Sequence, residues 1–404
     1  MIDSDANSSG LLFEDSNDFD LVYSAVPFPP FSSQILSFLQ TLSVELLSTP
    51  ESRTFPDIAT FAFWCRKSSL IKMKVDFESR ENRVGRGNIF HVAPGNVPIN
   101  FAYSLAAGLL AGNSNVVKLP SQESIQISVV CSTIDRLLVS EEHKSLKNHI
   151  RLIRYDRTDT KVTNKLSSLC DVRVIWGGDN TISSIRQSQI GARAFDVTFA
   201  DRYSICMIDA NEYLDNKEPD KLAKDFFNDT YLFDQNACTA PHLIVWRGSE
   251  MKIAEAKEKF WAKVHALVKS SYEFQAVSSI DKLSATYRYL AQNTNATFVH
   301  GLDNLVSRLD VTDPLPGLDE WKASCGLFFE VNVESITEVA HLITRRYQTV
   351  SYFGIEPNEI MEMIIDKGLF GIDRIVRVGR TLDFSLYWDG FDLIKTLSRV
   401  ISVS

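Results

Sequence analysis

The chain has 404 residues, of which 45% are apolar and 23% charged, a composition typical of a soluble globular protein. It is too long for one ordinary hydrophobic core, so we expect two or three domains. Its 51 acidic and 42 basic residues give a net charge of −9, which argues against a general nucleic-acid-binding surface but allows a local basic pocket.

Six cysteines are scattered along the chain, and none forms a CxxC pair or stands at zinc-ligand spacing from a histidine. We therefore expect no metal site, and reduced thiols in a cytoplasmic protein. The acidic N-terminus lacks the basic region of a signal peptide, and residues 1–20 are expected to be poorly ordered. Residues 91–117 carry no Asp, Glu, Lys or Arg, but the continuous helical part is too short for the roughly 20 residues of a membrane span.

The first half of the chain predicts helices followed by an alternation of strands and helices. Apolar residues recur at helical spacing between residues 28 and 72. Strands are predicted at 88–92, 114–119, 150–155 and 172–176, with helices at 99–110, 124–139 and 181–189. Ser121 is a candidate N-cap for the second of these helices. This alternation indicates an α/β fold, a parallel sheet with helices on both faces.

The alternation continues beyond residue 200. Strands are predicted at 204–209 and 243–246, and a strand and turn at 373–380. Helices are predicted at 221–231, 249–270 and 336–345, and a helix and last strand within 391–404, whereas residues 271–326 give no clear pattern. We expect an N-terminal helical segment at 1–75, a cofactor-binding domain at 76–230, a catalytic domain at 231–370 and a C-terminal return and oligomerisation segment at 371–404.

Cys238 is the strongest candidate for a catalytic residue. It follows an apolar, aromatic segment and lies at a predicted turn, among small and amide residues, just before a strand. Small neighbours leave room for a planar acyl group, and amide donors can stabilise an oxyanion. The alternative is a small buried thiol, which is the usual role of free cysteine. His242 lies four residues on, too far along an extended strand to assist, and is interpreted as structural.

One loop and one lysine lie where parallel sheets bind ligands. Pro94, Gly95 and Asn96 follow the strand at 88–92 and precede a helix, so Asn96 offers a neutral amide donor at the carboxyl end of the sheet. A tight structural turn is the alternative. Lys118 ends a buried strand, where it either grips a ribose or phosphate or extends from the sheet edge into water.

Gly177 and Gly178 separate a strand from a helix. Glycines at such a turn let the backbone approach a pyrophosphate, and the helix N-terminus favours anions. The pattern is not GxGxxG, and paired glycines after a strand are common. Alone, this signal for a nucleotide site is weak.

The order and spacing of these pieces resemble the aldehyde dehydrogenase superfamily, and most closely the LuxC-type acyl-CoA reductases. The resemblance covers roughly residues 80–404 and implies an α/β fold with two doubly wound parallel-sheet domains and a small C-terminal return segment. It maps the oxyanion asparagine onto Asn96, the lysine that contacts the adenosine ribose onto Lys118, and the nucleophilic thiol onto Cys238. Pro94, Gly95, Ser121, Gly177 and Gly178 are then expected near the cofactor. Asp373–Val376, Gly379–Arg380, Asp383–Phe384 and Trp388–Gly390 look characteristic of the reductase branch.

The chain departs from the superfamily pattern at two glutamates. Phe199 stands where aldehyde-oxidising members carry the glutamate that activates water, and a phenylalanine is no general base. The glutamate that contacts the nicotinamide ribose is not clear either; Glu330 is a loose candidate, with plain surface charge as the alternative.

The resemblance implies NADPH-dependent reduction of an acyl thioester, a long-chain acyl-CoA or an acyl-protein, to an aldehyde through a Cys238 thioester. The preference for NADPH over NADH is implied only by the family resemblance. An acyl-protein synthetase partner and a homo-oligomer are expected, with the tail strand at 400–403 as a candidate subunit contact. The alternatives are an aldehyde dehydrogenase that forms acyl-CoA or acid, which Phe199 makes less favourable for the acid, and a non-catalytic binding protein on the same fold.

Overall fold

The computed structural model describes residues 24–77, 81–95, 97–299, 301, 303–322 and 324–403. The chain forms two compact units, residues 1–200 with 391–404, and residues 201–390. The predicted boundary after residue 230 differs from this division, because β7 (Tyr203–Asp209) pairs with strands of the second sheet and belongs to the second unit. The predicted return segment likewise shortens to residues 391–404. The predicted disorder of residues 1–20 lies outside the described residues.

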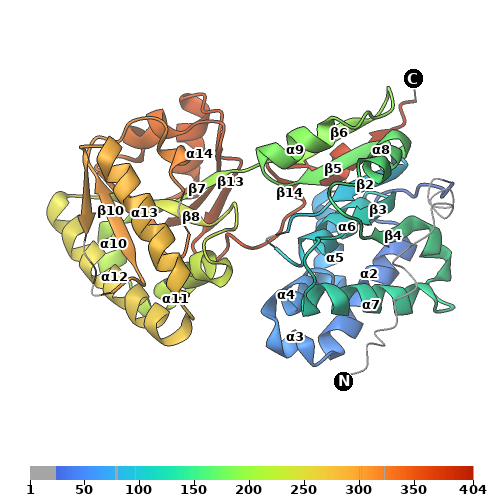
Figure 1. Cartoon of the computed structure of the whole chain (residues 1–404), viewed down its shortest axis with the longest axis horizontal. Helices are drawn as coiled ribbons and strands as arrows, with labels where there is room; N and C mark the ends of the chain where they lie inside the picture. The colour runs from blue at the N-terminus through green and yellow to red at the C-terminus, as the bar shows by residue number, and fades with distance from the viewer. Residues whose placement is uncertain are drawn as a thin grey trace. The chain divides into compact units, whose positions relative to one another are not determined.

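The first unit is built on a five-stranded parallel sheet in the order β4-β3-β2-β5-β6. Counted along the chain, this is the 3-2-1-4-5 order of a dinucleotide-binding fold. Helices α6 and α7 lie on one side of the sheet, and α8 and α9 on the other (Figure 1). Its elements are α2 (Ser33–Ser48), α3 (Glu51–Thr54), α4 (Pro56–Trp64), α5 (Lys67–Phe77), β1 (Arg83–Gly85), β2 (Asn88–Val92), α6 (Asn100–Leu110), β3 (Ser114–Lys118), α7 (Ile125–Leu138), η2 (Lys144–His149), β4 (Ile150–Ile153), α8 (Thr160–Leu169), β5 (Val172–Trp176), α9 (Asp179–Arg186), β6 (Phe195–Phe199), β15 (Phe391–Asp392), α15 (Leu393–Leu397) and β16 (Ser398–Val400).

Strand β2 sends alternate side chains to the two faces of this sheet. Phe90 and Val92 enter the apolar cluster on the side of α8 and α9. His91 faces α6 instead, where its Nδ1 lies 2.7 Å from the Ser104 hydroxyl and its Nε2 lies 3.0 Å from Asn115 Oδ1. Asn115 Nδ2 donates to a backbone carbonyl, so its Oδ1 accepts a hydrogen bond from the His91 Nε2–H group. Ser104 then donates to Nδ1, which ties β2 to α6 and β3 through a neutral imidazole.

Stability is expected to fall between pH 6.5 and 4 because of His91. Burial lowers the pKa of His91 from 6.5 to about 4, while the unfolded chain keeps the ordinary value. Protons therefore bind the unfolded state preferentially in this window. As the pH falls through it, the free energy of unfolding decreases by up to about 3 kcal/mol. Urea denaturation of the wild type and of His91→Gln at pH 7 and pH 4.5 measures it. An equally steep loss in the variant would assign the effect to other groups.

The C-terminal tail returns to the first unit. Strand β16 pairs antiparallel with β1, and the Ile401 N–H continues this ladder by donating to the Asn82 carbonyl at 2.8 Å. The tail strand at 400–403 was predicted as a candidate subunit contact, which stays a prediction; within the chain, Val400 pairs with Arg83. Arg83 fixes the return by donating to the Ser398 hydroxyl at 2.9 Å.

The second unit contains a seven-stranded sheet in the order β13-β12-β7-β8-β11-β10-β9, parallel except for β9. Helices α11 and α12 pack on one face, and α13, η5 and α14 on the other. Its elements are β7 (Tyr203–Asp209), α10 (Ala210–Leu214), α11 (Pro219–Thr230), η3 (Tyr231–Phe233), β8 (Pro241–Arg247), α12 (Glu250–Ser271), α13 (Ala276–Gln292), β9 (Ala296–Val299), β10 (Ser307–Val311), η4 (Leu318–Glu320), β11 (Leu327–Val333), η5 (Ile336–Leu342), β12 (Tyr347–Phe353), α14 (Pro357–Asp366), β13 (Arg374–Arg377) and β14 (Tyr387–Trp388).

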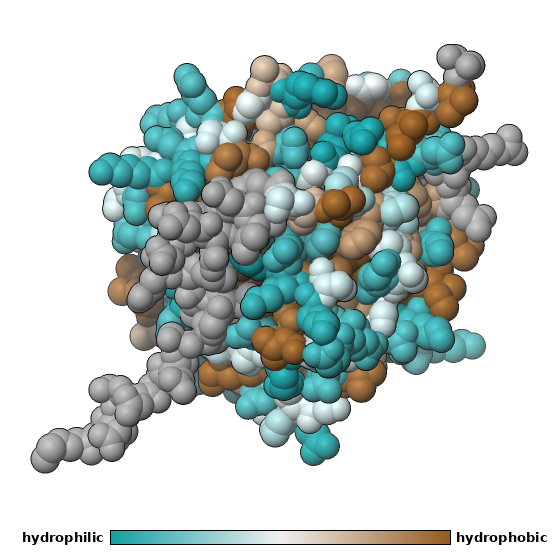
Figure 2. Space-filling view, turned by 90° about the vertical axis from the view of Figure 1, so that its right-hand side faces the viewer, coloured by the Kyte–Doolittle hydropathy of each residue, from teal (hydrophilic) through white to brown (hydrophobic). Residues whose placement is uncertain are grey.

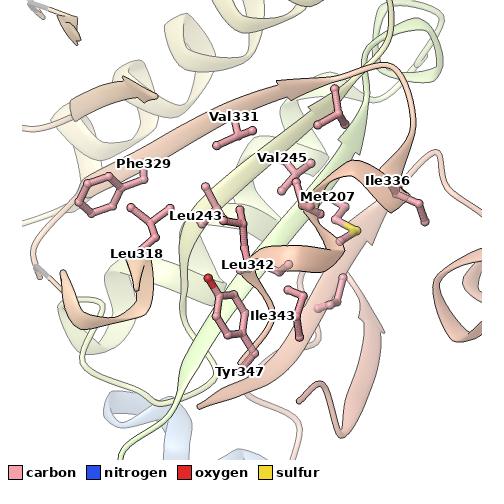
Figure 3. Close-up of a cluster of buried hydrophobic side chains, with 14 of the residues drawn as sticks. Met207, Leu243, Val245, Leu318, Phe329, Val331, Ile336, Leu342, Ile343 and Tyr347 are labelled. Carbon is pink, nitrogen blue, oxygen red and sulfur yellow. The ribbon is translucent and has the colours of Figure 1, made fainter. Parts of the chain in front are cut away.

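A large apolar core fills the face of this sheet that α13, η5 and α14 cover. Figure 3 shows side chains from neighbouring strands pointing toward one another there: Met207, Leu243, Val245, Phe329, Val331 and Tyr347, with Leu318, Ile336, Leu342 and Ile343 from η4, η5 and the residue after it. Because the strands run parallel and are buried, their sequences are nearly continuous apolar runs.

Two local predictions are corrected. Residues 336–345 were predicted as an amphipathic helix, but the segment forms the 3₁₀ helix η5, which begins with a capping box at Ser335 and Glu338. The N-cap of α7 is Ser124 rather than Ser121, because Ser124 Oγ accepts from the Ile127 N–H at 3.2 Å. Ser121 is exposed, three residues before this cap.

The surface is mixed in character. On the face drawn in Figure 2, hydrophobic residues are interspersed with hydrophilic ones. None of the helices in the described part of the chain combines the length and hydropathy needed to cross a bilayer. The uncharged stretch at 91–117 forms β2, α6 and β3 instead, three buried elements of the first unit.

Candidate active site

The turn that carries Cys238 is held by a buried amide. Gln235 has a left-handed backbone (φ 61°), and its Nε2 donates to the carbonyls of Pro241 at 3.0 Å and Leu327 at 3.1 Å. Its Oε1 accepts from the Gly326 N–H at 3.0 Å. These bonds pin the turn to β8 and β11, so the position of the thiol is fixed by the sheet.

A second turn closes against the first. The Cys325 N–H donates to the Asp234 carbonyl at 2.9 Å, and Gly326 follows with φ 86°. A Cβ on Gly326 would lie 2.4 Å from the Tyr231 hydroxyl and 2.6 Å from the Leu305 carbonyl. Glycine is therefore required at this position by both conformation and space.

Cys238 itself is half-buried at the amino end of β8. The Ser204 hydroxyl donates to its carbonyl at 2.7 Å, which links the turn to β7. Burial and the Asp389 carboxylate raise the pKa of the thiol to about 11, against the Gln348 amide and the Lys322 and Arg202 cations, which lower it. The resting thiol is thus protonated at neutral pH.

The groups around the thiol meet at the amino edge of the seven-stranded sheet. Arg202 precedes β7, Lys322 precedes β11, Gln348 is the second residue of β12, and Asp389 follows β14. Ligands of open α/β sheets usually bind at the carboxyl ends of strands, so this site lies at the opposite edge from the one that rule indicates.

Sequence reasoning missed Gln348, Lys322 and Arg202 as neighbours of Cys238. Asp389 falls within the 388–390 segment that resembles the reductase branch, but no role was assigned to it. A signal was present in Trp388-Asp389-Gly390, since a carboxylate between an indole and a glycine suits a buried turn. Asp389 and Gly390 indeed have φ values of 47° and 76°.

The candidate cofactor residues of the first unit share the carboxyl edge of its sheet. Lys118 pairs with Val92 in the β2–β3 ladder, and residues 93–95 follow β2 at the same edge. Gly177 and Gly178 follow β5, on the other side of β2. The strand order reverses between β2 and β5, and this switch point is where such sheets bind dinucleotides.

Lys118 is half-buried, and its Nζ lies 4.9 Å from the centroid of the Tyr155 ring. Burial lowers its pKa, which Asp156 partly offsets. Tyr155 is held in turn by Thr163, with the two side-chain oxygens 3.0 Å apart. The ammonium is thus kept at the strand end by an aromatic face, where a cation–π contact stabilises it.

The glycines at this edge leave open space. A Cβ on Gly95 or Gly178 would meet no described atom within 4 Å, and neither has the positive φ that would demand glycine. The fold alone therefore gives no reason for glycine at these positions, whereas close approach of a ligand would. Asp179 is the first residue of α9, and its negative charge reduces the attraction of this helix end for anions. The glycines would therefore favour a ligand by leaving space for it, and not by electrostatic attraction.

Phe199 and Glu330 lie in packed surroundings. The Phe199 ring stacks on Trp176 at 3.8 Å between centroids, so this side chain is part of a packed aromatic pair. Glu330 was considered as a ribose contact or a surface charge; the structure places it fully buried on β11. Its carboxylate accepts from the indoles of Trp246 and Trp261, each at 2.8 Å, which makes it a core residue.

Asn96 lies outside the described residues, so its role as oxyanion donor stays a prediction. Pro94 is half-buried and Gly95 exposed at the end of β2. His242 is buried, with its ring stacked 5.4 Å from Tyr203, as a structural histidine would be.

Comparisons with known proteins agree with this architecture. Among solved structures, aldehyde dehydrogenase 21 from Physcomitrella patens, determined with the product succinate, has a TM-score of 0.66 at 12% identity and matches 95% of this chain and 89% of its own. A lactaldehyde dehydrogenase has a TM-score of 0.61 at 13% identity, over 89% and 82% of the two chains. The fold is therefore that of the aldehyde dehydrogenases, as predicted.

Sequence comparisons narrow the family. A long-chain acyl-protein thioester reductase of Vibrio harveyi is 24% identical over 325 residues, 78% of this chain and 63% of the relative. The protein of the same name from Aliivibrio fischeri is 22% identical over 330 residues, 78% of this chain and 64% of its own. The chain thus spans just under two thirds of these relatives. The family model described as acyl-CoA reductase (LuxC) matches residues 65–400, and the chain belongs to this family.

Proposed function

We propose that the protein reduces a long-chain acyl thioester to the aldehyde, with a nicotinamide cofactor and Cys238 as the acyl-carrying nucleophile. The observation that carries the proposal is the Cys238 turn, a half-buried thiol pinned by Gln235 and surrounded by Gln348, Asp389, Lys322 and Arg202. A merely structural cysteine needs no such polar surroundings.

The chain's own residues account for the acyl-transfer half of the reaction. The Cys238 sulfur attacks the thioester carbonyl, and its proton leaves as the new carbon–sulfur bond forms. The Cys238 N–H and Asn96 are proposed to hold the oxyanion of the tetrahedral intermediate. Expulsion of the first thiol leaves an S-acyl enzyme. With phenylalanine at position 199, no carboxylate is available there to direct water at this thioester, which favours reduction over hydrolysis.

A nicotinamide dinucleotide fits the first unit. The 3-2-1-4-5 strand order, Lys118 beside the switch point and the open space at Gly95 and Gly178 are the features that such a ligand needs. When bound, the cofactor supplies hydride to the acyl carbon. Lys118 would hold the ribose or phosphate, with Pro94, Ser121 and Gly177 nearby. The preference for NADPH rests on the family and is tested by parallel kinetics with NADH.

The acyl donor is proposed to be either an acyl-CoA or an acylated protein. The curated relatives are named as acyl-protein thioester reductases, which favours a protein donor and an acyl-protein synthetase partner. Product analysis tests the reaction. The proposal predicts aldehyde from a long-chain acyl thioester with NADPH; formation of acid or acyl-CoA from aldehyde as the only detectable reaction would instead support an aldehyde dehydrogenase.

Replacing Lys118 by methionine is expected to weaken NADPH binding by about tenfold, the value of one charged hydrogen bond. Stability should not decrease, because the half-buried ammonium gives way to an apolar chain of similar length against Tyr155. Calorimetric titration gives the affinity, and thermal unfolding the stability. Lys161→Met, which removes an exposed charge on α8, is the control. Unchanged NADPH affinity in Lys118→Met would remove Lys118 from the proposed site.

A further inference from the structure

Asp389 is a buried carboxylate whose charge raises the pKa of the proposed nucleophile, Cys238. Its side chain is 3% exposed, and its Oδ1 accepts a hydrogen bond from Gln348 Nε2. The other oxygen, Oδ2, lies 4.0 Å from Arg202 Nη1, beyond hydrogen-bonding distance. One oxygen is therefore fixed, while the other remains able to accept a proton.

Gln348 joins this carboxylate to the thiol. It is 1% exposed on β12, and it lowers the pKa of Cys238. The next residue, Thr349, donates to Ser204 Oγ at 3.3 Å, and this hydroxyl donates to the Cys238 carbonyl at 2.7 Å, which ties this part of β12 to the Cys238 turn. Gln348 Oε1 has no hydrogen-bond partner within the described ranges of the chain. A buried amide oxygen without a partner costs free energy. We infer that the interactions of the amide with Asp389 and Cys238 offset this cost, and that the oxygen stays available to a further donor.

The cations that face this pair are engaged with other groups. Arg202 bonds to Asp373 and donates to the Tyr347 carbonyl at 2.8 Å. Arg374 donates to the Thr381 carbonyl at 2.6 Å and to the carbonyls of Arg380 and Asp383.

Lys322 bonds to Asp201 at 2.6 Å and also donates to the Arg202 carbonyl. Arginine and ammonium groups cannot accept a proton. Of the carboxylates, Asp389 has the largest effect on the thiol, whereas Asp373 and Asp201 are occupied by Arg202 and Lys322.

We infer that Asp389 is the general base and acid of acyl transfer, with Gln348 as its positioning residue. As the Cys238 Sγ–C bond forms, the Sγ–H bond breaks and the proton passes to Asp389. As the thioester's own C–S bond breaks, Asp389 returns this proton to the departing sulfur. The step exchanges one thioester for another without oxidation. The inference rests on the proposed function and adds the proton carrier to it.

The electrostatics of the pair suit this role. Burial raises the pKa of Asp389 to about 6, against Arg202, Gln348 and Arg374 but with Asp373 acting in the same direction. A proton carrier works best when its pKa lies near the working pH. The thiol, with its pKa of about 11, keeps its proton until a carbonyl carbon is ready to accept the sulfur's electron pair.

The pH dependence of acylation distinguishes this route from attack by a preformed thiolate. The test is the rate of S-acylation of the wild type by a long-chain acyl-CoA without cofactor, followed by rapid quench and intact-mass spectrometry over a range of pH. Transfer to Asp389 predicts a rate that rises with pH around 6, as the carboxylate deprotonates, and then levels off. A rate that rises tenfold per pH unit up to about 11 would overturn the inference in favour of free thiolate.

The variant Asp389→Asn is expected to move two readouts in opposite directions. Acylation should slow by about 100-fold or more, the usual contribution of general acid–base catalysis. Alkylation by iodoacetamide, which needs only thiolate, should speed up near neutral pH, because loss of the negative charge lowers the midpoint of the alkylation profile by about one unit. Acylation as fast as in the wild type would contradict the inference, and so would slower alkylation.

Two further variants complete the test. Gln348→Ala should slow acylation and raise the alkylation midpoint, since it removes a donor to the thiolate; a structural role alone would leave that midpoint in place. Asp383→Asn, which alters a half-exposed carboxylate paired with Arg380, should change neither readout. If the wild type forms no adduct with any donor, the proposed function itself fails; if it acylates and Asp389→Asn acylates equally, only the inference fails.

Discussion

Cys238→Ala is expected to form no acyl-enzyme and to lose turnover by about 10⁴-fold or more, as when other enzymes lose their nucleophile. The reason is local: the Gln348 amide and the Asp389 carboxylate both act on the pKa of this sulfur. Since alanine fits the half-buried position without new polar contacts, we expect the melting temperature to change little. Single-turnover acylation and steady-state aldehyde formation measure the loss.

Cys131→Ala is the matched control, because Cys131 is a half-buried thiol on α7 and belongs to the first unit, whereas the Cys238 turn belongs to the second. It should acylate and turn over like the wild type. Retention of aldehyde formation in Cys238→Ala would mean that another group carries the acyl chain, and the proposed mechanism would have to be abandoned.

Glu330→Ala is expected to lower the free energy of unfolding by about 3–5 kcal/mol, the cost of breaking a buried ionic network. The carboxylate accepts from two indoles at 2.8 Å and from Arg308 at 3.3 Å, with Lys257 at 4.0 Å. Its removal leaves buried donors without an acceptor. Urea denaturation measures the change.

Glu330→Gln separates the core role from a cofactor role. The glutamine still offers an acceptor to the indoles but loses the charge, so its stability should lie between that of wild type and alanine variant, with NADPH affinity unchanged. The opposite pattern, normal stability with weakened NADPH binding, would restore Glu330 as a ribose contact and contradict its assignment to the core.

The alternation of strands and helices in the first unit was predictable because each element signals itself locally. The strands at 88–92 and 172–176 were predicted with the boundaries that β2 and β5 have. The order in which they pair was not, since pairing depends on contacts between distant segments. That order is what brings Lys118, Gly95 and Gly178 to one sheet edge.

The residues that surround Cys238 could not be predicted from the sequence. Arg202, Gln348 and Asp389 come from separate stretches of the chain, and neither Arg202 nor Gln348 has a sequence feature that marks it. Glu330 shows the converse: an acidic residue ordinarily indicates surface, and only the two indoles facing it reveal a buried acceptor. Single-residue signals identify a nucleophile, whereas its neighbours follow from tertiary packing.

Intact-mass spectrometry detects the proposed Cys238 acyl-enzyme without any assay of product. The protein is mixed with a long-chain acyl-CoA without cofactor, and NADPH is added afterwards. We expect a mass gain equal to one acyl group, absent in Cys238→Ala, that disappears with NADPH as aldehyde is formed. An adduct that persists in Cys238→Ala would show that another residue carries the acyl group, and an adduct that NADPH does not discharge would show that the acyl-enzyme is not the species reduced.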